Sequence, residues 1–383
     1  MSDTHEEAEI RRLTPREDPK TAELITQPRA RPPATRVGAL GWMREHLFSG
    51  PFNSLLTVLI GALLLYTIPA LFQWALLNAH WATDAQTCRT GDGACWSFVV
   101  EKFRFMIFGL YPPELHWRPA LAVVIFLSMV AISTQSRFWN RKLLWGWVAV
   151  FILCYMLMAG GVLGLEEVPN TLWGGLPLTL MLSVVGVGIA LPLGILLALG
   201  RRSELPAIRA LCVGYIELIR GVPLISLLFM ASVMFPLFLP EGVTIDKLLR
   251  AQVAIIMFAA AYMAEVVRGG LQAIPKGQYE AAAALGLNYW QMTRLIILPQ
   301  ALNITIPPMV NTFIGLFKDT SLVLIIGLFD LLTTTKAALT DPQWLGFSLE
   351  AYLFAALIYF IFTFFMSQYS QHLEARLAAE KEH

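Results

Sequence analysis

Long stretches without a charged side chain constrain this sequence more than any other feature. Phe52–Asn78, Pro119–Ser136, Leu143–Leu165, Val168–Gly200 and Ala351–Leu373 contain no Asp, Glu, Lys or Arg. Each is near or above the roughly 20 residues that an α-helix needs to cross the hydrocarbon core of a bilayer. Only 14% of the 383 residues are charged, whereas soluble domains carry about 25%. The sequence therefore predicts an all-α, polytopic membrane protein.

Basic residues beside these stretches set the expected orientation. Residues 1–50 are polar, rich in arginine and proline, and have no apolar run near their start. We therefore expect a disordered cytoplasmic tail rather than a cleaved signal peptide. The loops at residues 137–142 and 201–202 are also basic and should stay inside. The long loop Ala79–Trp117 and the acidic Glu166–Glu167 should then lie outside.

The second half of the chain is apolar but more interrupted. One span is expected from about Ala210 to Glu241, although three prolines punctuate it. Another runs from about Ala251 to Ile274. A third, about Asn303–Leu328, carries two adjacent prolines and the charged pair Lys318–Asp319. With the five uncharged runs, this gives about eight spans and places both chain ends in the cytoplasm.

The expected outer loop contains the stretch CRTGDGAC, in which Cys88 and Cys95 are separated by six residues. An oxidising compartment permits a disulfide, and a short loop with glycines lets the two Cα atoms approach within bonding range. A metal site that adds His80 and His116 lacks the ligand spacing of zinc sites. The disulfide is the favoured interpretation, and we expect no metal or cofactor.

A polar segment, Gln278–Gln300, interrupts the apolar second half. Its first part is rich in alanine, the strongest helix former, and Gly286 can end that helix in the left-handed conformation. Asn288 can cap a second helix, which Pro299 should end. The pattern predicts two short helices joined at a glycine bend. On these grounds alone, an amphipathic linker lying on the membrane surface is an equal alternative.

The spacing of residues within this segment resembles the EAA motif of ABC importer permeases at every motif position. In that family the two short helices are coupling helices, which dock into a cleft on an ATP-hydrolysing subunit. The resemblance implies that the segment couples the membrane helices to a separate ATPase. The matching residues are Glu280, Ala281, Ala282, Gly286, Ile296, Leu298 and Pro299.

Neighbouring stretches narrow the resemblance. YIELIRGVPLISLLF, AYMAEVVRGGLQAIPKGQYEAA and FKDTSLV look like permeases for polar amino acids of the histidine, glutamate, glutamine and arginine type. This resemblance covers roughly Thr171–Gln371 and implies a five-span type I importer core. The longer layout, with CRTGDGACW and YPPELHWRP, is similar to general L-amino-acid permeases of the AapM/BztC type from Gram-negative bacteria. The chain should begin with a disordered cytoplasmic tail (1–50), followed by three extra spans (51–170) that include the outer loop at 79–117. The permease core (171–375) should follow, with the two short helices and their bend, called the elbow, at 278–300. A short cytoplasmic tail (376–383) should end the chain.

The expected function is that of a membrane permease subunit of an ABC importer that moves L-amino acids across a bacterial inner membrane. The chain has no G-x-x-x-x-G-K-[ST] phosphate loop, so ATP must be hydrolysed by another polypeptide. The resemblance implies an ABC ATPase dimer, a second homologous permease and a periplasmic amino-acid-binding protein as partners. A net charge of +1 gives no electrostatic support for nucleic-acid binding.

Two other classes of function remain as alternatives. An ion-coupled secondary amino-acid transporter or channel would also be polytopic with buried charges, but it would not need a segment that docks on an ATPase. A membrane-embedded enzyme is disfavoured because neither H-E-x-x-H nor G-x-S-x-G occurs, and we expect no catalytic residues.

An amino-acid substrate brings an ammonium and a carboxylate, which call for charged groups or helix ends in the path. Ionisable residues at membrane depth are costly and mark candidate sites. Asp319 is the deepest, although it could simply pair with Lys318, and Glu217 with Arg220 could form an interfacial ion pair. Glu265 and Arg268, beside the cytoplasm, are expected to be structural. The candidates for the substrate path are Glu217, Arg220, Asp319, Thr320 and Ser321.

Overall fold

The computed structural model describes residues 38–162 and 164–379. Of the two expected tails, residues 1–37 and 380–383 lie outside the described residues. Residues 38–46, which belong to the stretch predicted to be disordered (1–50), form a helix, so that part of the prediction is wrong. The chain divides into two compact units, Met1–Leu77 and Asn78–His383. In the first unit, α3 (Gly38–His46) precedes α4 (Pro51–Phe72), whose last turn continues as a π-helical turn, Gln73–Leu77.

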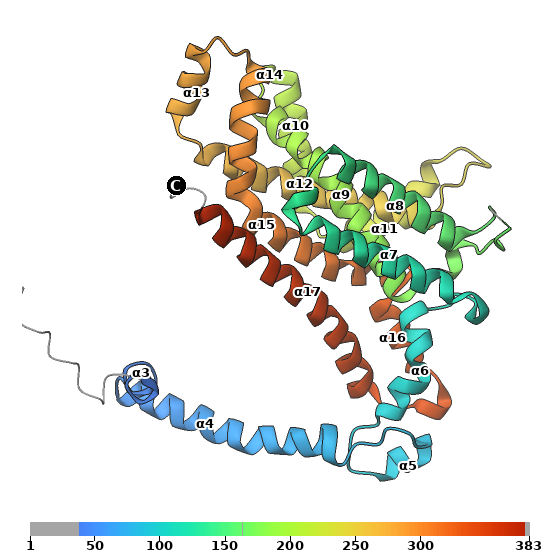
Figure 1. Ribbon diagram of the computed structural model, residues 1–383. Helices are drawn as coiled ribbons and strands as arrows, with labels where there is room; N and C mark the ends of the chain where they lie inside the picture. Colours follow the sequence, from blue (N-terminus) through green and yellow to red (C-terminus); the bar gives the residue numbers. More distant parts are fainter. Residues whose placement is uncertain (1–37, 163, 380–383) are drawn as a thin grey trace, which may run out of the picture. The chain divides into compact units, whose positions relative to one another are not determined.

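The second unit is built from long helices and short connecting helices (Figure 1). Its first half contains α5 (Ala85–Thr90), α6 (Trp96–Phe108), α7 (Trp117–Ser133), α8 (Arg141–Ala159) and α9 (Gly175–Arg201). Its second half contains α10 (Pro206–Gly221), α11 (Leu224–Phe229), α12 (Lys247–Ala273), α13 (Lys276–Ala284), α14 (Tyr289–Met292), α15 (Leu298–Asp319), α16 (Leu331–Ala338) and α17 (Ser348–Ala379).

Seven helices in the described ranges are long and apolar enough to cross a membrane, or eight when the bent pair α10 and α11 counts as one span. This confirms the predicted all-α, polytopic fold with about eight spans. Within those ranges the only strand is β1 (Phe329–Asp330), which bridges to Gly174 and Gly175 at the start of α9.

Helix α12 lies at the centre of the second unit, packed against α9, α10 and α15 (Figure 1). Small residues on α9 allow this close approach. A Cβ placed on Gly194 would lie 2.7 Å from the Cβ of Met263, so only glycine fits there. Helix packing in membranes relies on such small residues, because no water is expelled between the helices.

The span expected from about Ala210 to Glu241 is present as two segments with a sharp bend between them. Helix α10 and the segment Leu224–Phe238 meet at an angle of 103°. Val222, between them, has an extended backbone with φ −110° and ψ 133°, because the ring of Pro223 disfavours a helical conformation in the preceding residue.

Two boundaries in the seventh span also differ from the prediction. Pro299 does not end the second helix of the elbow, since α14 continues through a π-helical turn, Thr293–Ile297, directly into α15. A π-helical turn is one way in which a helix re-satisfies the backbone groups that a proline frees. Asp319 is not in the middle of a regular helix. It is the last residue of α15, and a 3₁₀-helix, Thr320–Ile326, follows.

Candidate functional site

The elbow, residues 278–300, is folded by local signals. Gly286 has φ +72°, the left-handed conformation that glycine adopts without strain. Its N–H donates to the carbonyl of Ala283 at 2.9 Å, which satisfies the end of α13. Asn288 and Gln291 then form a reciprocal capping box at the start of α14, with bonds of 3.1 and 2.9 Å. The predicted bend and the predicted cap are therefore both present.

One side of the elbow packs on the helix bundle and the other side is open. Ala282 and Ile297 are buried, whereas Glu280, Ala281 and Gly286 are exposed. The outer side carries large apolar side chains that the sequence reasoning missed, and they are 50–76% exposed. Exposed apolar groups that gather in one place mark interaction surfaces. They are Leu285, Tyr289, Trp290 and Leu295.

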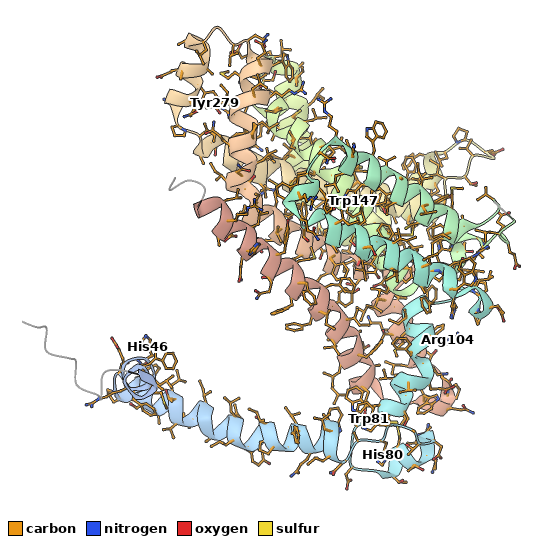
Figure 2. The ribbon with its side chains drawn as sticks, in the orientation of Figure 1. His46, His80, Trp81, Arg104, Trp147 and Tyr279 are labelled. Carbon is orange, nitrogen blue, oxygen red and sulfur yellow. A yellow bond between two sulfur atoms is a disulfide. The ribbon has the colours of Figure 1, made fainter. Side chains whose placement is uncertain are left out.

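Tyr279 joins the elbow to the end of α9 (Figure 2). Arg202 Nη1 donates to the hydroxyl of Tyr279 at 3.1 Å and to the carbonyl of Leu271 at 3.3 Å. The same guanidinium lies 5.6 Å from the centre of the Tyr279 ring. The contact is therefore both a hydrogen bond and a cation–π interaction.

Directly beside this joint, two glutamates and three arginines from α9, α10 and α12 form an ionic cluster. Glu265 is its hub: Oε2 lies 3.4 Å from Arg201 and 3.7 Å from Arg220, and Oε1 accepts from Arg268. Arg201 also donates to Glu217 at 2.9 Å. The alternative of a direct ion pair between Glu217 and Arg220 is not found, since the two residues take different partners within one cluster.

Asp319 lines an open pocket of about 390 Å³ together with Phe258, Tyr262 and Asn311. The ring of Tyr262 also lies 5.5 Å from the guanidinium of Arg220, so one aromatic side chain contacts both the ionic cluster and the pocket. Within the described chain, no ion pair joins Asp319 to its neighbour Lys318.

The remaining two candidates beside Asp319 differ in their surroundings. Thr320 is buried and its hydroxyl donates to the carbonyl of Phe317 at 2.7 Å. Ser321 is half-buried. The structure thus brings Arg220 and Asp319 near the same tyrosine, whereas Glu217 pairs with Arg201 and does not line the pocket.

At the other end of the second unit, residues 78–117 form a cap. A disulfide joins Cys88 and Cys95, with a Cα–Cα distance of 5.5 Å. The backbone N–H of Cys95 donates to the buried carboxylate of Glu350 on α17 at 2.9 Å. The region predicted as an outer loop thus contains two helices, α5 and α6, that pack on the segment before α17.

Several polar contacts attach the cap to the rest of the unit. Lys102 forms an ion pair with Asp341, and its ammonium holds the pKa of that carboxyl below the usual range. Arg89 donates to the carbonyls of Pro342 and Gln343 at 3.3 and 3.1 Å.

Asp330 links α16 to α17 inside the same end of the unit. It is fully buried, caps α16 through the N–H groups of Leu332 and Thr333, and accepts from the hydroxyl of Tyr359 at 3.2 Å. Nothing in the local sequence distinguishes Asp330 from a loop aspartate, and the sequence reasoning missed it.

Comparisons with known proteins agree on one family. The family model of the binding-protein-dependent transport system inner membrane component matches residues 190–379. The chain is 53% identical over 344 residues to the inner membrane amino-acid ABC transporter permease protein YhdY of Escherichia coli strain K12, covering 88% of this chain and 93% of the relative.

A second relative extends over a similar share. The chain is 41% identical over 415 residues to the glutamate/glutamine/aspartate/asparagine transport system permease protein BztC of Rhodobacter capsulatus, covering 90% of this chain and 95% of the relative. A crystal structure of an amino acid ABC transporter with histidines is 32% identical and covers 53% of this chain and 92% of that chain, with a TM-score of 0.47.

Proposed function

The chain belongs to the family of binding-protein-dependent inner membrane transport components, the ABC importer permeases, and on that premise we propose that it imports L-amino acids through a path beside Asp319. It is a transport subunit and not an enzyme, since ATP hydrolysis in this family resides in a separate partner. The comparisons give no support to the ion-coupled alternative.

The elbow carries the coupling part of this proposal. Two short helices joined at a bend present exposed apolar side chains around Gly286, a shape suited to insertion into a cleft of another protein. We assign the coupling role to the seven residues of the EAA pattern and add Leu285 and Trp290 as contact residues. Their partner is an ABC ATPase dimer, and a second homologous permease completes the membrane part.

The orientation follows from the same assignment. Because the ATPase is cytoplasmic, the elbow faces the cytoplasm, and the opposite end with the cap faces the periplasm. Both chain ends are then cytoplasmic, the permease core extends over residues 171–375, and residues 51–170 are an addition to it. The basic residues Arg201 and Arg202 lie on the elbow side, as the positive-inside rule requires.

Asp319 is the proposed contact for the substrate ammonium. Its carboxylate lines a pocket with Tyr262 and Asn311, and no ion pair with Lys318 neutralises it in the described chain. The guanidinium of Arg220 stacks over the ring of Tyr262, where its positive charge attracts the substrate carboxylate. Thr320 and Ser321 position Asp319 at the transition from α15 to the 3₁₀-helix.

A matched pair of glycine variants tests the coupling role. Gly286 and Gly277 both have open space where a Cβ would lie, but only Gly286 has a positive φ. A β-branched residue is a genuine outlier at positive φ. Gly286→Val should therefore distort the bend, reduce ATPase association and abolish most uptake, whereas Gly277→Val should transport normally. Uptake of labelled amino acids and copurification of the ATPase measure both effects. Normal uptake by Gly286→Val contradicts the coupling assignment.

Asp319→Asn tests the substrate path. The change keeps the size of the side chain and removes its charge, so uptake should fall at least tenfold while expression and ATPase association stay normal. Glu241→Gln, which removes an exposed carboxylate outside the pocket, is the control. If expression falls first and Lys318→Met restores it, Asp319 has a structural role. Unchanged uptake of acidic, neutral and basic amino acids would remove Asp319 from the path.

A further inference from the structure

A groove of about 680 Å³ lies between the cap and the core, at the end of the unit opposite the elbow. Arg104 of α6, labelled in Figure 2, lines one side together with Glu101 and Phe105. Ala337 of α16 and Pro342, which follows that helix, line the other. Neither the coupling elbow nor the substrate path uses this groove. The stretch YPPELHWRP, which the permease core does not account for, contributes Tyr111, Pro113 and His116 to its cap side.

The two walls of the groove are held in place by several contacts. The hydroxyl of Thr334 on α16 donates to the carbonyl of Met106 on α6 at 2.7 Å. Lys102 and Asp341, which also line the groove, form an ion pair across it. The disulfide and Glu350 fix the start of α6. A groove with fixed walls loses little conformational entropy on binding, which favours affinity.

The chemistry of the groove is that of a protein interface. Its lining includes apolar and aromatic side chains, those of Phe105, Leu110 and Tyr111. Glu101 and Arg104 lie at its rim. Within the described residues neither forms an ion pair or a side-chain hydrogen bond. An apolar centre bordered by unpaired charges of both signs is the usual anatomy of a specific protein–protein contact.

We propose that this groove, called the cap groove here, is the docking surface for one lobe of the periplasmic substrate-binding protein. The proposal rests on the proposed function, which places the cap outside. An anionic lipid headgroup would require a cationic rim, whereas this rim carries one acidic residue, Glu101, and one basic residue, Arg104. The matching partner surface is an apolar or aromatic loop flanked by a base opposite Glu101 and an acid opposite Arg104.

The position of the groove also suggests why it is built from two parts. The family-wide region begins at residue 190, so α16 belongs to it and α6 does not. A lobe of the binding protein that contacts both walls therefore binds to the family-wide core and to the added cap at the same time. The cap therefore restricts the permease to its own binding protein.

The test uses the complete transporter with its ATPase in proteoliposomes, titrated with purified, substrate-loaded binding protein. Arg104→Glu and Glu101→Arg should each raise the concentration for half-maximal stimulation of ATP hydrolysis about tenfold, the effect of one central interface residue. Glu114→Arg is the matched control, because Glu114 is also an exposed glutamate of the cap but does not line the groove. It should titrate like the wild type.

A photo-crosslinker supplies a second measurement that does not depend on charge. Placed at Leu110, which lines the groove, it should capture the purified binding protein; placed at Val100, on α6 but not in the groove, it should not.

Equal titrations of wild type, Arg104→Glu and Glu101→Arg would overturn the proposal, and so would an equal shift in Glu114→Arg. If free amino acid alone prevents the photo-crosslinker at Leu110 from capturing the binding protein, the groove is a small-molecule site and not a docking surface. A wild-type transporter that shows no stimulation at all contradicts the proposed function rather than the docking surface.

Discussion

The acidic side chains at the two ends of the second unit are held differently, although the cap end also contains one part-exposed ion pair, Lys102–Asp341. At the elbow end, Glu217 and Glu265 pair with arginines while their side chains remain 55% and 21% exposed. At the cap end, Asp330 and Glu350 are 0% and 6% exposed and accept hydrogen bonds from backbone N–H groups. A disulfide adds a covalent link at the cap end only.

This difference has an energetic consequence. A solvent-exposed ion pair contributes about 0–1 kcal/mol, because water competes for both charges. Removing the acceptor from a buried hydrogen bond costs about 1–3 kcal/mol, because the donor is left without a partner. The exposed pair of Glu217 with Arg201 can therefore exchange partners at low cost, whereas the buried hydrogen bonds of Asp330 and Glu350 cannot. That arrangement suits a transporter in which motion enters at one end and recognition takes place at the other.

The largest expected effect is at Asp330. Asp330→Ala removes the cap of α16, worth about 1 kcal/mol, and leaves the hydroxyl of Tyr359 and a buried backbone N–H without an acceptor. The total destabilisation should be about 3 kcal/mol, seen as a lower thermal unfolding temperature and weaker accumulation in membranes. Glu217→Ala, which removes an exposed partner of Arg201, should change stability by less than about 1 kcal/mol. Equal losses in the two variants would remove the contrast between the ends.

The next effect concerns the disulfide. Cys88→Ser combined with Cys95→Ser should destabilise the cap by about 2 kcal/mol, the value expected for a short cross-linked loop. The wild type in reducing conditions should approach the variant, as measured by thermal unfolding with and without reductant. Cys212→Ser, at a free cysteine elsewhere in the unit, is the control and should respond to reductant as the wild type does. A cap that unfolds at the same temperature after reduction would show that packing alone holds it.

Hydropathy and local backbone chemistry account for what the sequence could predict. A bilayer imposes length and apolarity on every span, so the uncharged runs located the helices. The bend at Gly286 and the cap at Asn288 depend on residues within a few positions of each other, and both are present. The roles of the coupling and substrate-path residues stay predictions.

The features that the sequence did not reveal depend on distant partners. Glu265 is a hub because Arg201, 64 residues away, reaches it from another helix. Helix α16 is too short and too polar for a hydropathy signal, and it is held by contacts such as that of Thr334 with Met106. No local pattern encodes either arrangement.

The smallest change in stability, with the clearest functional readout, is expected where the elbow meets α9. Tyr279→Phe removes the hydroxyl that bonds to Arg202 and to the carbonyl of Leu271 and keeps the ring beneath the guanidinium. The loss should be about 0.5–1 kcal/mol, equivalent to roughly a two- to fivefold change in an equilibrium. Because the contact lies between the elbow and the ionic cluster, this loss should appear as fewer amino acids imported per ATP hydrolysed.

A double-mutant cycle separates this role from a purely local one. Tyr279→Phe and Arg202→Gln act on the same contact, so their combined effect on uptake per ATP should be smaller than the sum of the single effects. Arg209→Gln is the control, because Arg209 bonds to the nearby carbonyl of Ser203 and not to the joint. Its effect should add independently to that of Tyr279→Phe. If the two changes at the joint also add independently, Arg202 and Tyr279 do not transmit motion together. If Tyr279→Phe instead lowers thermal stability as much as Asp330→Ala, the elbow end is as rigid as the cap end, and motion must enter the bundle elsewhere.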